Sequence, residues 1–161
     1  MTATRLLIVI GAVLVLGAVN ASIVSKERIK SNGDVVFIEL GPRDPRSLMQ
    51  GDYMALRFPI AQQIAASWGA GGAPREGEIR TAGITLNEQR VAALAKPGAP
   101  STLPLRYRMR NREVWLGTNA FFFEEGADKR FAPARYGEFR LDPASGEAVL
   151  VGLRDAKLNP L

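Results

Sequence analysis

The 161-residue sequence contains no cysteine and no histidine. Without cysteine the chain has no disulfide bonds and no thiol nucleophile, and without either residue it has no zinc site of the usual kind and no histidine-dependent catalytic triad. Acid–base chemistry would have to come from carboxylates or from a serine–lysine pair. We therefore expect neither a metal ion nor a cofactor.

The overall composition is that of one globular domain. Apolar residues make up 47% of the chain and charged residues 23%, which excludes a largely disordered protein. Sixteen acidic residues offset the 21 basic ones, so the net charge of +5 does not indicate a nucleic-acid-binding protein. We expect no nucleic acid among the partners.

A long apolar run opens the chain. Residues 6–24 read LLIVIGAVLVLGAVNASIV and carry no charge. At a rise of ~1.5 Å per residue this stretch is about 29 Å long, which matches the ~30 Å hydrocarbon core of a bilayer. Because backbone groups in lipid must satisfy one another, the run predicts a single transmembrane helix. The polar segment that follows can continue the helix for about two turns until Gly33 ends it.

The same residues would also suit a cleaved signal peptide, since Arg5 precedes the apolar run and small residues surround Asn20. Ile23 and Val24 resume the apolar character beyond that point, which favours an anchor. The short tail before Arg5 is typical of an exported domain, although the basic residues after position 25 would favour a cytoplasmic one. We expect the domain to lie outside the cytoplasm.

Short β-branched and aromatic segments dominate the rest of the chain. Residues 35–40 and 52–58 have the composition of strands, and residues 60–66 that of a short amphipathic helix. Three hairpins are predicted, pairing 78–86 with 90–94, 103–109 with 114–119, and 136–141 with 148–153. A helix is the alternative for 90–94. The expected fold is a mainly β, antiparallel sandwich or half-open barrel with one or two short helices. The boundaries are 1–25 for the anchor, 26–33 for a polar stalk and 34–161 for the domain.

One of these strands carries a motif. In Gly51-Asp52-Tyr53-Met54-Ala55-Leu56-Arg57-Phe58, alternation places Tyr53, Ala55 and Arg57 on one face and Met54, Leu56 and Phe58 on the other. The segment resembles the signature of the bacterial GDYXXLXY family, except that Phe58 replaces the final tyrosine, which points to packing at this position. Further similar blocks surround Asp44, Asn119 and Tyr136.

The resemblance implies a bacterial membrane-associated protein with one amino-terminal membrane segment, often encoded beside or fused to a polytopic membrane protein. It implies no substrate or catalytic residue. The residues that carry it, as structural or binding positions, are Asp44, Pro45, Arg46, Gly51, Asp52, Tyr53, Leu56, Phe58, Gly117, Asn119, Phe123, Glu125, Gly126, Arg135 and Tyr136.

Two side-chain clusters outside the motif are candidates for binding. Arg106, Arg108, Arg110 and Arg112 alternate along LRYRMRNR, and guanidinium groups bind phosphate or carboxylate. A solvated, charged sheet edge explains the same pattern without a ligand. The run Phe121–Phe123 must turn at least one ring to the other face of its strand. Core burial is the favoured interpretation of this run, and a patch for a membrane partner is the alternative.

These features predict a membrane-anchored, extracytoplasmic accessory domain of the bacterial inner membrane. Its expected partners are the bilayer and an integral membrane protein, and it is more simply explained as a non-enzymatic subunit. The alternative is a membrane-tethered hydrolase that acts on envelope carbohydrate or peptide through a pair of carboxylates. Adjacent Glu124 and Glu125 would point to opposite faces of a strand and cannot form that pair together.

Overall fold

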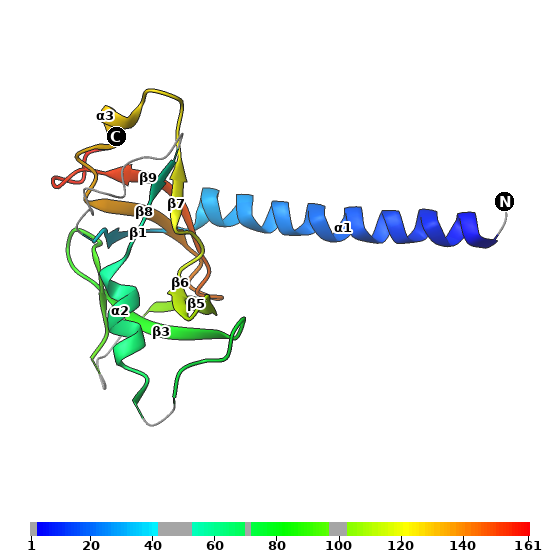
Figure 1. Cartoon of the computed structure of the whole chain (residues 1–161), viewed down its shortest axis with the longest axis horizontal. Coiled ribbons are helices and arrows are strands. Elements are labelled where there is room, and N and C mark those ends of the chain that lie inside the picture. Colours follow the sequence, from blue (N-terminus) through cyan, green and yellow to red (C-terminus); the bar gives the residue numbers. More distant parts are fainter. Residues whose placement is uncertain (1–2, 42–52, 70–71, 97–102) are drawn as a thin grey trace.

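A computed structural model of the chain describes residues 3–41, 53–69, 72–96 and 103–161 (Figure 1). Nine strands and three helices follow in the order α1 (Ala3–Asn32), β1 (Asp34–Glu39), β2 (Tyr53–Ala55), α2 (Pro59–Ala66), β3 (Ile79–Leu86), β4 (Ala92–Leu94), β5 (Leu103–Arg110), β6 (Glu113–Trp115), β7 (Ala120–Phe122), α3 (Asp128–Phe131), β8 (Tyr136–Leu141) and β9 (Ala148–Arg154) within these residues.

Helix α1 projects from the domain as a single rod (Figure 1). Its apolar part is exposed along its whole length, and it is the one helix in the described part of the chain that is long and apolar enough to cross a membrane. Only Ile29, in its last turns, is buried, where α1 contacts β8 and β9. The polar segment after position 25 is therefore helical and already part of the domain's packing.

The helix ends at Gly33, as the sequence predicts. The Gly33 N–H donates to the Ile29 carbonyl over 2.8 Å. A Cβ at this position would lie 2.5 Å from that same oxygen and 3.1 Å from the Leu141 carbonyl. Only glycine allows the chain to pass this close to β8 on its way into β1.

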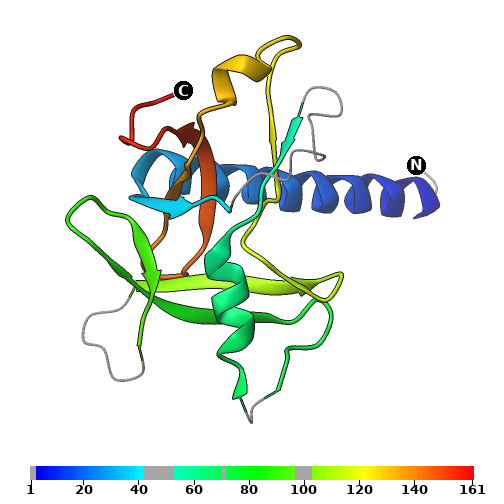
Figure 2. The same ribbon diagram turned by 60° about the vertical axis from the view of Figure 1, so that its left-hand side comes forward.

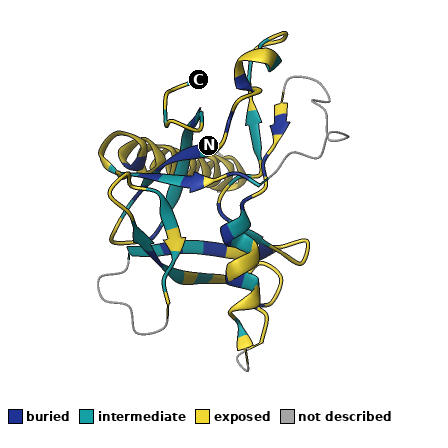
Figure 3. Cartoon of the chain, turned by 90° about the vertical axis from the view of Figure 1, so that its left-hand side faces the viewer, coloured by how far each residue is buried: buried dark blue, intermediate teal, exposed yellow. Residues whose placement is uncertain are grey.

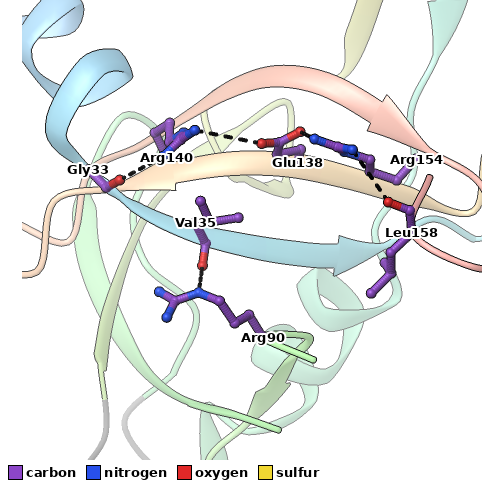
Figure 4. Close-up of polar contacts among 7 residues, drawn as sticks. All are labelled: Gly33, Val35, Arg90, Glu138, Arg140, Arg154 and Leu158. Atoms are coloured by element: carbon purple, nitrogen blue, oxygen red, sulfur yellow. Dashed lines mark hydrogen bonds and ion pairs between the residues drawn. The ribbon is translucent and has the colours of Figure 1, made fainter. Parts of the chain in front are cut away.

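All paired strands within the sheets are antiparallel. One sheet has the order β1-β8-β9, a second has the order β4-β3-β5-β6, and β2 pairs with β7. An isolated bridge between Phe37 and Val91 brings the first two sheets edge to edge, and the Phe37 N–H donates to the Arg90 carbonyl over 3.0 Å. The Arg90 side chain closes the same seam by donating to the Val35 carbonyl over 2.6 Å (Figure 4). The result is a half-open barrel, which confirms the predicted fold class.

The core lies between the two larger sheets (Figures 2 and 3). Val36 and Ile38 from β1 meet Phe139 and Leu141 from β8, and Ile84 and Leu105 come from the opposite sheet, all with 1% exposure or less. Helix α2 adds Ile60 and Ile64, four residues apart on one face, as predicted.

The predicted strands and hairpins are present with altered limits. Residues 92–94 form β4, so the helical alternative for that segment is wrong. The strand expected over 114–119 pairs with β5 only as far as Trp115, and Gly117 follows two residues later with a φ of +103°, outside the β region. The strand expected over 52–58 has ladder pairing only at Tyr53–Ala55, yet its alternation holds, since Met54, Leu56 and Phe58 are buried and Tyr53, Ala55 and Arg57 exposed.

Candidate functional site

The motif strand β2 pairs with β7 and presents two aromatic rings to solvent. Tyr53 lies opposite Phe122, and their ring centroids are 5.7 Å apart. Tyr53 is 38% exposed and Phe122 is 74% exposed. Exposed apolar side chains that lie together, unlike single ones, are candidates for contact with lipid or another protein.

The phenylalanine run divides between the core and the surface. Phe121 and Phe123 pack against the core and both contact the Phe131 ring, at centroid distances of 5.1 and 5.2 Å. Core burial is thus confirmed for these two rings and wrong for Phe122. The reason is the period of a strand, which sends the middle ring of three to the opposite face from its neighbours, where it is exposed.

Strand β5, which carries Arg106, Arg108 and Arg110 and which we term the arginine strand, has its side chains on the predicted faces. Tyr107 and Met109 are buried, while Arg106 is half-buried and Arg108 and Arg110 are exposed. The hairpin turn is formed by Asn111 and Arg112, both with positive φ, and the Glu76 carboxylate accepts hydrogen bonds from their backbone N–H groups. The Arg110 guanidinium stacks 4.5 Å above the Trp115 ring, and that of Arg108 lies 5.9 Å from it.

Arg106 and Arg108 also line a groove of about 550 Å³, which we term the anchor-side groove. Its walls come from the last turns of α1, the start of β3, strand β5, the segment from β6 to β7, and the turn and first residues of β9. The charged side chains in it are Lys26, Arg106, Arg108 and Glu147, and its apolar wall includes Phe122 and Ile79. The groove thus brings the arginine strand, the exposed Phe122 ring and helix α1 to one place.

Glu147 ties two of these cations together. It forms ion pairs with the Lys26 ammonium and with the Arg106 guanidinium, the latter at 3.1 Å. The Glu147 side chain is 15% exposed, whereas Lys26 and Arg106 keep 50% and 37% of their side chains exposed. The carboxylate is therefore held inside while the cations remain open to solvent.

The Asp142 carboxylate shapes the turn that carries Glu147. It accepts hydrogen bonds from the Ser145 hydroxyl over 2.6 Å and from the backbone N–H groups of Ala144 and Ser145. These hydrogen bonds, that of the Ser145 hydroxyl first, lower the pKa of Asp142 below its ordinary value. At neutral pH the turn is consequently held by a fully ionised carboxylate.

A second groove of about 400 Å³ lies between α2 and β6. Arg57, Arg112 and Glu113 are its charged lining residues. Asn119 lines it as well, and the Asn119 carbonyl accepts a hydrogen bond from the Leu56 N–H over 2.7 Å. The side-chain hydrogen bonds of this turn come from Thr118, whose hydroxyl contacts both the N–H and the carbonyl of Ala120.

Among the described residues, the most buried carboxylate is that of Glu138, which takes part in an ion cluster on the outer face of β8. Its carboxylate accepts from Arg154 at 2.7 Å and lies 3.9 Å from the Arg140 guanidinium (Figure 4). Arg154 also donates to the Leu158 carbonyl, and Arg140 to the Gly33 carbonyl. This cluster joins the end of α1, β8 and the carboxyl-terminal turn, so its role is structural.

The remaining motif residues occupy turns and packing positions. Phe58 is buried with its ring edge-on to Phe139, at a centroid distance of 5.5 Å. Glu125 and Gly126 form an exposed turn before α3. Arg135 uses its backbone to join Leu40 and Arg154, and half-buried Tyr136 opens β8. Asp44, Pro45, Arg46, Gly51 and Asp52 lie outside the described residues.

Sequence reasoning missed Lys26 and Glu147 as members of the site. They are far apart in the chain, and no local pattern links the end of a long apolar helix to a hairpin turn. The one usable signal was Lys26 itself, the first charged residue after the apolar run.

Comparison with known proteins gives one result. No curated protein and no solved structure matches the chain. The family model described as GDYXXLXY protein matches residues 15–153, from within the apolar part of α1 to β9. This span includes the motif strand, the arginine strand and both grooves, and the chain therefore belongs to the GDYXXLXY family.

Proposed function

We propose that this protein is a non-enzymatic accessory domain of the bacterial inner membrane, anchored by α1, that contacts an integral membrane protein on the extracytoplasmic side. The contact is made by an arginine–aromatic surface consisting of Tyr53, Phe122, Trp115, Arg108 and Arg110. The observation that carries the proposal is Phe122, a phenylalanine 74% exposed beside cationic side chains. Aromatic and arginine residues are the types enriched where proteins bind one another.

The position of this surface supports a partner in the membrane. The β5–β6 hairpin reaches out on the side of the domain from which α1 leaves, in both views of the ribbon (Figures 1 and 2). Phe122 and Arg108 line the same groove as Lys26 of α1. A protein embedded beside α1 would meet this side of the domain first.

A membrane-tethered hydrolase has less support. Cleavage of a glycosidic bond by carboxylates needs two of them about 5–10 Å apart across one site. Among the described residues, each of the two grooves has a single carboxylate in its lining, Glu147 or Glu113, and Glu147 is already paired with two cations. Glu138 is likewise occupied by its arginine partners.

The partner is tested by site-specific photocrosslinking in native membranes. A benzophenone amino acid replaces Phe122 in the full chain, and the control carries it at exposed Glu88 in the β3–β4 turn. We expect an adduct with an integral membrane protein from position 122 and none from position 88. Adducts with lipid alone, or equal adducts from both positions, would refute the proposal.

The side of the membrane is tested with a single introduced thiol. Because the chain has no cysteine, Glu88→Cys gives one labelling site on the domain. We expect a membrane-impermeant maleimide to label it in intact spheroplasts. Labelling only after lysis would place the domain in the cytoplasm.

A further inference from the structure

The anchor-side groove lies close to where the bilayer surface must be if α1 spans it. Lys26, in the groove, follows the end of the apolar run at Val24 by two residues. A hydrocarbon core of ~30 Å accommodates residues 6–24, and a headgroup layer of roughly 5–7 Å follows on each side. Lys26 and the groove residues in contact with it are therefore at the depth of lipid headgroups.

The groove is cationic at that depth. In the part of the chain that the structure describes, Lys26, Arg106 and Arg108 face a single carboxylate, Glu147. Glu147 engages Lys26 and Arg106 but leaves their side chains 50% and 37% exposed, so each has N–H donors free to bind an anion. Arg108 has no carboxylate partner among the described residues, and its guanidinium is a fork of donors suited to phosphate.

Apolar side chains border the cations. Ile79 is 57% exposed and Phe122 is 74% exposed, and both line the groove. Cations beside exposed apolar side chains match an amphiphile with an anionic head, because the phosphate and the first acyl carbons are adjacent in the same molecule. A free phosphate ion would use only the cations.

We propose that the anchor-side groove binds the headgroup phosphate of one anionic phospholipid from the membrane that holds α1. Lys26, Arg106 and Arg108 bind the phosphate, Glu147 holds two of these cations in position, and Phe122 and Ile79 contact the proximal part of the acyl chains. This goes beyond the proposed partner protein, because the site is complete in one chain and a bilayer.

The test uses the full chain in neutral detergent without any partner, so that its outcome is independent of the crosslinking result. Native mass spectrometry measures retention of phosphatidylglycerol and of phosphatidylcholine with the same acyl chains. We expect one phosphatidylglycerol molecule to be retained in preference to phosphatidylcholine. Arg106→Gln with Arg108→Gln should weaken retention by about fivefold for each arginine replaced.

The matched control is Lys129→Gln with Arg130→Gln, which makes the same charge change on α3, an element that contributes no lining residue to the groove. It should retain phosphatidylglycerol like the wild type. Arg108→Gln alone keeps the test valid if the double variant does not fold, since Arg108 has no ion pair to lose among the described residues. Phe122→Ser should also weaken retention without altering folding, because its ring is exposed.

Three outcomes would overturn the proposal. Equal retention of the two lipids would show that the headgroup is not recognised. Equal loss in the α3 control would show a general effect of net charge. Displacement of phosphatidylglycerol by an equimolar amount of inorganic phosphate would show a site for a soluble anion.

Discussion

Two glutamates in this protein each hold two cations, and they do so to different ends. Glu138 binds Arg154 and Arg140, whose remaining donors reach the backbone carbonyls of Leu158 and Gly33. Glu147 binds Lys26 and Arg106, whose side chains are 50% and 37% exposed in a groove. The Glu138 group is therefore closed by backbone contacts, whereas the Glu147 group is more open to solvent and faces a groove.

The largest loss of stability should come from removing the Glu138 carboxylate from the closed cluster. Glu138→Ala leaves the Arg154 guanidinium, whose side chain is only 22% exposed, without its carboxylate. We expect the free energy of unfolding to fall by about 2–3 kcal/mol, less than for a fully buried pair because some solvent reaches both arginines. Denaturant unfolding of the full chain in detergent measures the change. Glu124→Gln, at an exposed position, is the control, and an equal loss there would contradict the assignment.

Replacing an arginine by lysine should destabilise the Glu138 cluster more than the Glu147 cluster, because the two clusters use the guanidinium geometry to different extents. Arg154 uses more than one guanidinium nitrogen on Glu138 and another on the Leu158 carbonyl, which a lysine ammonium cannot reproduce. Arg154→Lys should lower the free energy of unfolding by about 1–2 kcal/mol. Arg106→Lys, in the open cluster, should change it by less than about 0.5 kcal/mol. A reversed order of the two losses would show that the groove cluster is the structural one.

Neutralising the second glutamate should affect binding more than stability. Glu147→Gln keeps the side chain's shape, and its cationic partners remain solvated, so the free energy of unfolding should fall by less than about 1 kcal/mol. The glutamine carbonyl can still accept hydrogen bonds from Lys26 and Arg106 and so keep them in position, while the groove becomes more cationic, so retention of phosphatidylglycerol should rise. Unchanged retention together with a loss as large as that of Glu138→Ala would contradict the comparison.

The smallest expected effect is the loss of stability at low pH that comes from Asp142, in the turn that carries Glu147. The pKa of Asp142 is lowered in the folded protein, so its ionised form is favoured by folding. This contribution to stability is fully present above the ordinary aspartate pKa of about 4 and is lost as the pH falls through the lower folded value. Unfolding measured from neutral pH downward should show a shallower decline in Asp142→Asn than in the wild type. An equal decline of stability with pH in both proteins would show that other carboxylates cause it.

Much of this architecture follows from local sequence. The alternation from Tyr53 to Phe58 fixes which side chains face the core even where the ladder stops at Ala55. Gly33 ends α1 because no other residue fits beside β8. These features depend on periods of two or 3.6 residues and on single glycines, which are visible without knowledge of the fold.

The charged clusters could not be predicted in this way. The Glu138 pairing depends on the register of β8 with β9, which shifts at the Glu138/Phe139 irregularity and sets Gly152 opposite Glu138. The Glu147 cluster joins a hairpin turn to a helix at the other end of the chain. Residues 90–94 are predicted as a hairpin arm with a helix as the alternative, and the pairing of residues 92–94 with β3 decides between the two.

The unbroken course of α1 has a mechanical consequence. A flexible linker would let the domain change its orientation relative to the lipid. Here α1 is one continuous helix up to Ile29, which is packed against the sheet. If that helix spans the bilayer, any change in its tilt, caused by a thicker membrane or a neighbouring helix, rotates the whole domain with it as a rigid body. Bilayer thickness then sets the height at which the domain stands.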